Sequence, residues 1–179
     1  GNAADDVIAA GIIPAGLEMM DQPATRAVEE YVHAGYDLNA AALLLCESDG
    51  TAEEVEEEIA RMTAVLKQSG AYDFRISQNE AERLKFWSGR KAAFPAVGRI
   101  SPDYYCMDGT IPRKRLGEVL RFIAAMETKY GLRCPNVFHA GDGNLHPLIL
   151  YDANQPDELP RPEAFAGEVR EKCIEVGGT

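Results

Sequence analysis

Two stretches of the sequence repeat apolar residues at the spacing of an amphipathic helix. Thr51 and Glu54 form a capping box ahead of the first stripe, and Gly70 stops it. The first stripe consists of Val55, Ile59, Met62 and Leu66. A second helix starts near Pro112, ends at Gly131 and presents Leu116, Val119, Leu120, Ile123 and Met126 on one face. Both stripes need an apolar surface to pack against.

Capping residues predict three further helices. Asn79 and Glu82 open one, and Asp21 with Pro23 opens a shorter one that runs towards His33. The last helix spans 162–176. Short apolar or β-rich runs lie between the helices and predict strands at 16–20, 42–46, 72–76, 104–107, 136–139 and 145–151.

The order strand, helix, strand occurs about twice, once before residue 78 and once after residue 103, without a repeat in the sequence itself. We therefore expect an α+β fold with two ferredoxin-like halves, 1–95 and 100–179, whose antiparallel sheets are covered by helices. The segment 94–102 is rich in Gly and Pro and is the candidate join between them.

The composition favours an ordinary globular protein, because 46% of the 179 residues are apolar and 26% are charged. With 29 acidic and 18 basic residues, the net charge of −11 repels nucleic acid and anionic lipid. An anionic small molecule would need a local basic group. Neither a transmembrane run nor a secretory signal is recognisable in the sequence, so a cytoplasmic protein is expected.

The four cysteines are widely spaced, so zinc knuckles, redox pairs and iron–sulfur ligation are not indicated. We interpret them as reduced core thiols. The sequence also lacks the Gly-x-Gly-x-x-Gly pattern of a dinucleotide-binding turn. Residues 1–3 resemble a tag remnant, and Gly177 follows a helix as though a further element came next, so we expect a piece of a longer protein.

The segment from His139 to His146 carries the strongest candidate chemistry. Asp142-Gly143 favours a two-residue type I′ turn, in which His139 directly opposes His146. Their Cβ atoms would then lie about 4.5–5.5 Å apart, close enough to share a divalent ion. The alternative is a hairpin whose histidines only form hydrogen bonds. The third histidine, His33, is expected to cap a helix.

Four segments together resemble the C-terminal domain of FAD-linked oxidases of the vanillyl-alcohol oxidase type. They are Ile12–Asp21, Phe86–Pro95, Arg99–Pro112 and Val137–Leu150, and the similarity extends over residues 1–179. The resemblance implies the substrate-binding cap of an enzyme that oxidises 2-hydroxy acids, incomplete in this chain. It also implies that FAD is bound mainly by a separate N-terminal domain, which this sequence lacks.

The resemblance also implies roles for individual residues. His139 and His146 would bind a divalent metal, with zinc as the candidate, while Asp142 and Asn144 would shape the turn and line the substrate or flavin side. Arg90, in a Trp-x-x-Arg segment, would bind the substrate carboxylate, since a guanidinium can donate two parallel hydrogen bonds.

The resemblance places two further groups beyond Thr179, the last residue of this sequence. In the family, a Gly-Glu-His-Gly motif follows a stretch similar to Val176–Thr179. That motif would supply an acidic metal ligand and the catalytic base, so no catalytic base is assigned among residues 1–179.

A departure from the family bears on the substrate. Members that act on 2-hydroxyglutarate carry a lysine where this chain has Cys106, which favours a small monocarboxylate such as glycolate or D-lactate. For a glycolate oxidase, the implied partners are other flavin and iron–sulfur subunits, and contact with the inner membrane would come through an electron acceptor. A D-lactate dehydrogenase and a non-catalytic metal-binding module of ferredoxin-like halves remain alternatives.

Overall fold

The computed structural model describes residues 3–156 and 158–179. Its fold is α+β, as the sequence predicts. The helices are α1 (Ala3–Ala9), α2 (Gln22–Val32), α3 (Ala52–Gln68), α4 (Glu80–Lys91), α5 (Ala93–Val97), a 3₁₀ turn (Arg113–Arg115), α6 (Leu116–Tyr130) and α7 (Pro160–Glu175). The strands are β1 (Gly16–Asp21), β2 (Ala42–Glu47), β3 (Asp103–Cys106), β4 (Gly109–Thr110), β5 (Asn136–His139) and β6 (Asn144–Tyr151).

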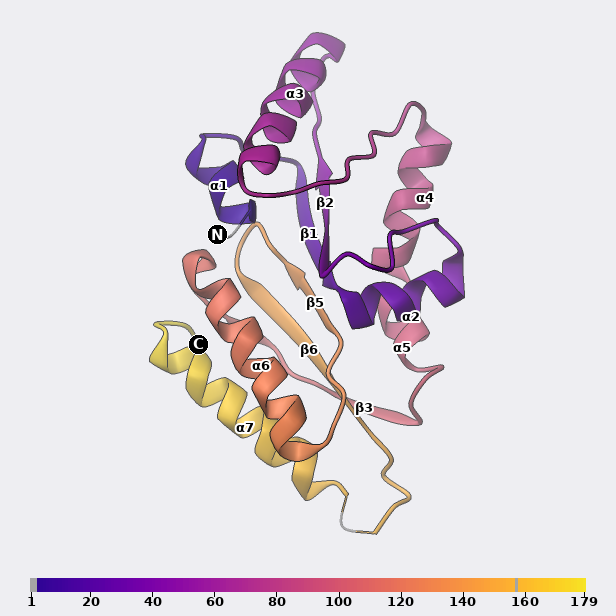
Figure 1. The fold of residues 1–179 in the computed structure, drawn as a ribbon, viewed down its shortest axis with the longest axis vertical. Coiled ribbons are helices and arrows are strands. Elements are labelled where there is room, and N and C mark those ends of the chain that lie inside the picture. The colour runs from indigo at the N-terminus through magenta and orange to yellow at the C-terminus, as the bar shows by residue number, and fades with distance from the viewer. Residues whose placement is uncertain (1–2, 157) are drawn as a thin grey trace.

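All the strands belong to one antiparallel sheet in the order β2-β1-β5-β6-β3, with β4 also paired to β6 (Figure 1). The α+β class and the antiparallel pairing are confirmed. Strand β1 from the first predicted half pairs with β5 from the second, so both halves contribute to a continuous sheet. Their status as separate units stays a prediction.

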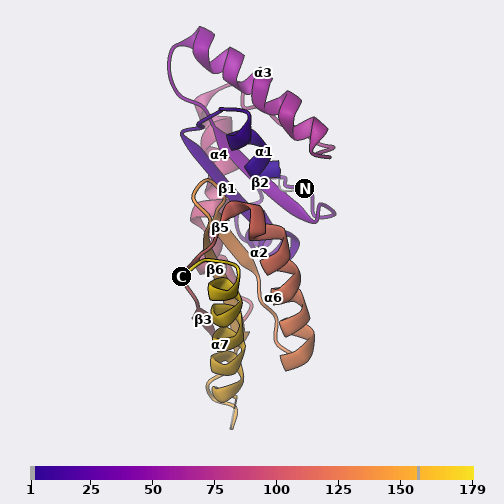
Figure 2. The same ribbon diagram turned by 90° about the vertical axis from the view of Figure 1, so that its left-hand side faces the viewer.

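Alternate residues of the strands face different surroundings. On one face, Phe138 and Leu145 pack against α6 and α7, which lie side by side. On the other face, Met20 and Val137 pack against α2 and α5. Helices α1 and α3 cover the β1–β2 end, and α3 lies at the end of the molecule opposite to α7 (Figure 2). The sheet is therefore covered on both faces over much of its area.

The helix signals of the sequence are largely confirmed. The capping box of α3 forms as expected, with Glu54 N–H donating to the Thr51 hydroxyl at 3.3 Å and Thr51 N–H donating to the Glu54 carboxylate at 2.8 Å. Asn79 caps α4, and Asp21 caps α2. His33 is the C-cap residue of α2 in left-handed conformation, and its side chain is exposed.

The strand predicted at 72–76 is wrong, because that segment is irregular in the structure. Its two aromatic residues, Tyr72 and Phe74, make side-chain contacts instead. The Tyr72 hydroxyl donates to Asp37 at 2.7 Å, and Lys67 lies over the ring of Phe74. The expected join at 94–102 contains part of α5, and the helix expected from Pro112 begins with a 3₁₀ turn.

The cysteines are free thiols, but they are not all in the core. Cys134 and Cys173 are buried, whereas Cys106 at the end of β3 is exposed, which corrects the prediction of core thiols. Burial raises the pKa of the Cys46 thiol to about 12. Within the described ranges, no helix has the length and apolar character required to cross a bilayer.

Candidate functional site

The β5–β6 hairpin differs from its predicted register. His139 pairs with Asn144 rather than with His146, and four residues, 140–143, form the loop. A type I′ turn needs positive φ at both central residues. Of the two, Gly143 alone has a positive φ, at 80°. The loop closes instead through a hydrogen bond from Gly143 N–H to the His139 carbonyl at 3.0 Å.

The two histidines nevertheless converge. The register differs from the prediction by two residues, and a shift of two leaves a side chain on the same face of a strand. The imidazole centroids of His139 and His146 lie 5.2 Å apart, with the rings nearly perpendicular. The sequence therefore predicted the correct neighbours from an incorrect turn.

Two residues of the loop fix its shape. A Cβ on Gly143 would collide with the carbonyl oxygen of Ile111, so this position requires glycine for space as well as for its φ. The exposed Asp142 accepts a hydrogen bond from Asn144 N–H at 3.0 Å. The Oδ1 atom of Asn144 is buried and has no hydrogen-bond partner among the described residues.

Arg90 lies in the last turn of α4, and close contacts hold that helix against the sheet. Gly16 in β1 leaves room for the Trp87 ring, which would lie 3.1 Å from a Cβ at that position. The Tyr36 hydroxyl donates to the Phe86 carbonyl and accepts from Gly89 N–H at 3.2 Å. Burial raises the pKa of Tyr36 to about 12, so the phenol stays protonated.

Glu18 of β1 joins the two candidate groups that lie far apart in the sequence. One carboxylate oxygen accepts from Arg90 Nε at 3.0 Å, and the other lies 2.6 Å from His139 Nδ1. The side chains of Glu18 and Arg90 are only 15% and 12% exposed. A carboxylate can only accept, so Nδ1 donates to Glu18, and in the neutral imidazole the other ring nitrogen, Nε2, carries the lone pair.

His146 is the more enclosed of the pair, with a side chain 16% exposed against 42% for His139. Its Nδ1 lies 3.6 Å from the Asp108 carboxylate. Burial lowers the pKa of His146 and outweighs the opposing effect of the Asp108 charge, while His139 and Arg90 act in the same direction as burial. A neutral imidazole, the form that binds metals, is therefore favoured at neutral pH.

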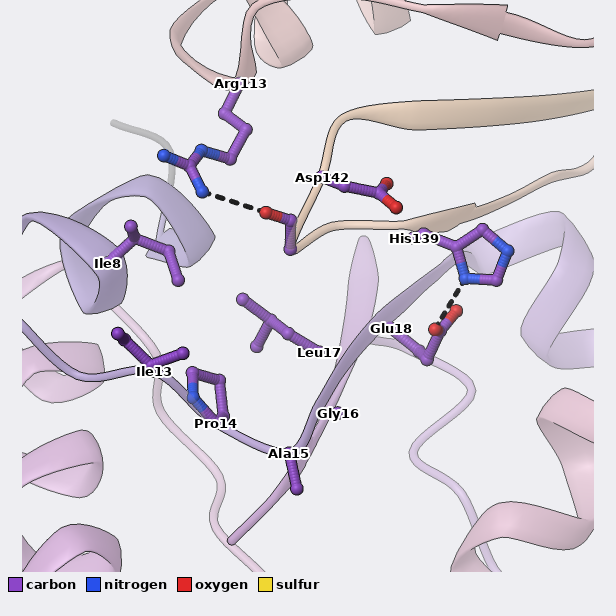
Figure 3. Close-up of a pocket in the computed structure, with 11 residues that line it drawn as sticks. Ile8, Ile13, Pro14, Ala15, Gly16, Leu17, Glu18, Arg113, His139 and Asp142 are labelled. Carbon is purple, nitrogen blue, oxygen red and sulfur yellow. Dashed lines mark hydrogen bonds and ion pairs between the residues drawn. The ribbon is translucent and has the colours of Figure 1, made fainter.

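A pocket of about 440 Å³ adjoins the cluster and reaches it at Glu18 and His139 (Figure 3). Arg113 donates a hydrogen bond to the Gly141 carbonyl at 2.8 Å at one side of this pocket, and Asp142 also lines it. The other wall is apolar and consists of Ile8, Ile13, Pro14 and Leu17. A ligand with one polar and one apolar side would match these walls.

The described residues supply an incomplete set of metal donors. Two imidazoles converge, but the described ranges contain no group of three or more His, Cys, Asp or Glu side chains that could hold an ion. Zinc sites normally use at least three protein ligands. His139 and His146 alone therefore fit only part of a metal site, and Glu18 is engaged by Arg90 and His139.

Thr179, after which the family resemblance predicts the catalytic base, lies next to β4. Its N–H donates to the Thr110 carbonyl at 2.8 Å, and its carbonyl accepts from Thr110 N–H at 3.1 Å. Thr110 in turn pairs with Asn144 of β6. Thr179 itself is not among the residues that line the pocket beside the cluster. The position of the base stays a prediction.

Sequence reasoning proposed roles for Arg90, His139, His146, Asn144 and Asp142 but gave Glu18 and Asp108 no role. The sequence does contain one indication that Glu18 is unusual, because it is the single charged residue in the otherwise apolar run Gly16–Met20. Its partners lie 72 and 121 residues away, so no local pattern reveals them. Asp108 lies between β3 and β4, and it approaches His146 because both of these strands pair with β6.

Comparisons with known proteins assign the chain to a family. The sequence pattern described as FAD linked oxidases, C-terminal domain, matches residues 1–179. The chain belongs to that family, and the members of the family are described as FAD-linked oxidases. The fold is also similar to that of a solved alkyldihydroxyacetonephosphate synthase, with a TM-score of 0.68 at 12% identity, over 99% of this chain and 36% of that one.

The curated relatives narrow the comparison. The chain is 59% identical to the glycolate oxidase subunit GlcD of Escherichia coli (strain K12), over 100% of this chain and 36% of the relative. It is 38% identical to the GlcD subunit of Bacillus subtilis (strain 168), over 97% and 37%. A probable mitochondrial D-lactate dehydrogenase of Danio rerio is 27% identical, over 97% and 35%. The chain thus spans just over a third of these relatives.

Proposed function

We propose that this chain is the substrate-binding cap of an FAD-dependent 2-hydroxy-acid oxidase, of the type of the glycolate oxidase D subunit. The observation that carries the proposal is the cluster of Arg90, Glu18, His139 and His146 at one end of the sheet. It places a guanidinium, suited to a carboxylate, beside two imidazoles, suited to a hydroxyl or a metal. A 2-hydroxy acid presents both groups on adjacent carbons.

Arg90 is the proposed carboxylate-binding residue. Glu18 offsets its charge, so what the guanidinium offers to an anionic substrate is its free hydrogen-bond donors. Glu18 occupies Nε, and the N–H groups of the two terminal nitrogens suit a bidentate contact with a second carboxylate. Asn144, opposite His139 in the ladder, has a buried amide oxygen suited to accept a hydrogen bond from substrate or flavin.

FAD, when bound, would accept the hydride from the α-carbon of the acid. We propose that residues outside this chain hold most of the cofactor, in keeping with the absence of a Gly-x-Gly-x-x-Gly turn from the sequence. Asp142, on the rim of the pocket beside His139, is the proposed flavin-side residue. The contribution of this chain is to bind the acid, orient it and exclude water.

His139 and His146 are the proposed ligands of a divalent metal, with zinc as the candidate. They need a third donor from outside the described residues. Such an ion would polarise the substrate hydroxyl as a Lewis acid. Zinc titration of the full-length protein tests this assignment, with His33→Ala as the control for loss of an exposed histidine. Loss of zinc affinity in His146→Ala alone supports it, whereas equal affinity in all three proteins contradicts it.

The third metal donor and the catalytic base are proposed to follow Thr179. The pairing of Thr179 with Thr110 supports this proposal, because Thr110 lies opposite Asn144, the residue that pairs with His139. A segment continuing from Thr179 would therefore start beside the hairpin that carries both histidines. Substitution of each acidic or histidine residue after Thr179 in the full-length protein tests it, and unchanged zinc affinity and activity in all of them would contradict it.

We propose glycolate or D-lactate, rather than a dicarboxylate, as the substrate. Cys106 precedes Asp108 by two residues, and Asp108 approaches His146, so position 106 lies near the cluster. A cysteine there offers no cation to a second carboxylate. Glycolate is the first choice because of the 59% identity to GlcD, and D-lactate dehydrogenase is the second candidate because relatives of that name align over nearly the whole chain. A multi-subunit enzyme with other flavin and iron–sulfur subunits follows from the glycolate oxidase assignment.

Anaerobic reduction of the flavin in the full-length protein tests the proposed function. We expect glycolate and D-lactate to bleach the flavin absorbance, and D-2-hydroxyglutarate to do so at least about ten-fold less efficiently, because its second carboxylate lacks a partner. Cys106→Lys should narrow that difference, while Cys106→Met, which adds bulk without charge, should not. Absence of reduction by all three acids would contradict the proposal.

A further inference from the structure

We propose that Glu18 is a positioning residue that holds Arg90 and His139 together in the orientation that the substrate requires. The inference rests on the proposed function and adds a residue to it. The Glu18 carboxylate borders the pocket, but both of its oxygens are engaged by Arg90 and His139. Its effect would be exerted entirely through the two groups that it holds.

The backbone around Glu18 is fixed from both sides. Strand β1 is an inner strand that pairs with β2 and β5, and Glu18 lies directly opposite His139 in the β1–β5 ladder. Directly opposite residues share a face with their Cβ atoms about 4.5–5.5 Å apart. Glu18 and His139 therefore meet because of strand register, whereas Arg90 reaches them from α4.

The two oxygens of the Glu18 carboxylate are divided between two partners. One accepts from Arg90 Nε at 3.0 Å and the other contacts His139 Nδ1 at 2.6 Å. The contact with Nε constrains the guanidinium plane and leaves the edge formed by the two terminal nitrogens for a second carboxylate. The contact with Nδ1 fixes the His139 tautomer and directs Nε2 away from Glu18. One side chain thus sets the direction of both functional edges.

A second bridge between the sheet and α4 provides an internal comparison. Glu47 of β2 contacts Arg83 of α4 at 3.1 Å, but those side chains are 32% and 38% exposed, against 15% and 12% for Glu18 and Arg90. Solvent weakens the exposed pair and leaves its side chains freer to move. Both pairs attach α4 to the sheet, but only the Glu18 pair extends to a histidine.

The test compares Glu18→Gln, Glu18→Asp and Glu47→Gln in the full-length, flavin-loaded protein. The amide of Glu18→Gln has one acceptor oxygen, so it cannot accept hydrogen bonds from Arg90 and His139 on separate atoms. We expect kcat/KM for glycolate to fall by about ten- to hundred-fold, with an increased KM and unchanged flavin content. Glu18→Asp, which keeps two acceptor oxygens, should recover part of the loss.

A spectroscopic readout separates positioning from a general structural role. Long-range ¹H–¹⁵N NMR of histidine-labelled protein, treated with a chelator so that no metal occupies Nε2, should show His139 protonated at Nδ1 in the wild type and shifted towards the Nε2-protonated form in Glu18→Gln. Its signal is assigned by its loss in His139→Ala. Glu47→Gln should leave the kinetics and the His139 tautomer at wild-type values.

Wild-type kinetics or a wild-type His139 tautomer in Glu18→Gln would overturn the proposal. So would equal kinetic losses in Glu47→Gln and Glu18→Gln, because these would show that attachment of α4 alone matters. Arg90→Ala distinguishes this failure from that of the proposed function. If Arg90→Ala loses activity and Glu18→Gln does not, only the positioning proposal fails, whereas wild-type activity in Arg90→Ala would remove the proposed function itself.

Discussion

The two faces of the β5–β6 hairpin carry different kinds of residue at adjacent positions. Phe138 and Leu145 face α6 and α7, with 0% and 1% exposure, and belong to the largest apolar cluster. Their neighbours His139 and His146 face the opposite way, towards Glu18 and Asp108. The core residues and the residues of the candidate site are thus adjacent along each strand, because successive side chains point to opposite faces.

This separation explains how a polar cluster can be held accurately. The packed face fixes the backbone of both strands, so the side chains of the other face inherit their positions without needing an apolar environment of their own. The same opposite face is apolar further along, where Val137 and Leu148 pack against α2 and α5. On this face of the hairpin, the part near Glu18 carries charged and polar side chains in place of apolar ones.

Phe138→Ala should give the largest loss of stability. Removing this buried ring leaves a cavity in the main core, and the free energy of unfolding should fall by about 3–5 kcal/mol. His139→Ala, one residue away, should change it by about 1 kcal/mol or less, because a half-exposed side chain loses one hydrogen bond. Denaturant unfolding followed by circular dichroism measures both, and equal losses would contradict the separation of the faces.

Gly143→Ala should have an intermediate effect on the hairpin. The residue has a φ of 80° and a Cβ would meet the Ile111 carbonyl oxygen, so we expect a loss of about 1–3 kcal/mol. Gly167→Ala in α7 is the matched control, because a Cβ there meets nothing within 4 Å and should stabilise the helix by about 0.5–1 kcal/mol. Thermal unfolding of both variants checks the contrast, and a harmless Gly143→Ala would reject this account of the turn.

Asp21 on the packed side should make a smaller, pH-dependent contribution. Burial raises its pKa, although hydrogen bonds from Ala24 N–H and Asn136 oppose that shift. A carboxyl whose pKa is higher in the folded state contributes stability that is lost as pH rises from about 4, its unfolded value, through the folded pKa. Asp21→Asn should remove this decline.

The measurement for Asp21 is the difference in unfolding free energy between wild type and Asp21→Asn at several pH values. As pH rises, the wild type should lose stability relative to the variant. Asp37 provides a control of opposite sign, since the hydrogen bond from Tyr72 lowers its pKa. A difference independent of pH for Asp21→Asn would show that burial does not govern this carboxyl.

The sequence predicts the features that depend on local rules. The capping box at Thr51, the stripe on α6 and the strand containing Val137 are confirmed, because caps and periodicity act over a few residues. The failures depend on tertiary context. The aromatic segment at Tyr72 makes side-chain contacts and forms no strand, and the hairpin loop has four residues because His139 pairs with Asn144 in the sheet.

The candidate site likewise contains residues that local patterns indicate and one that depends on tertiary context. Histidine spacing and the resemblance to FAD-linked oxidases identified Arg90, His139 and His146. Glu18 was missed because its role depends on the β1–β5 register and on the approach of α4, which no local pattern encodes. The proposed binding residues can be named from motifs, whereas the proposed positioning residue is recognised only from the fold.

The specificity constant of Arg90→Ala in the full-length protein tests the central claim most directly. Loss of two charge-assisted hydrogen bonds to the substrate carboxylate should lower kcat/KM by about a hundred-fold or more for both glycolate and D-lactate, without loss of flavin. Arg90→Lys, which keeps the charge but not the fork, should fall between this variant and the wild type. An unaltered kcat/KM for both acids in Arg90→Ala would contradict the account, because the cluster around Glu18 would then not be the substrate site.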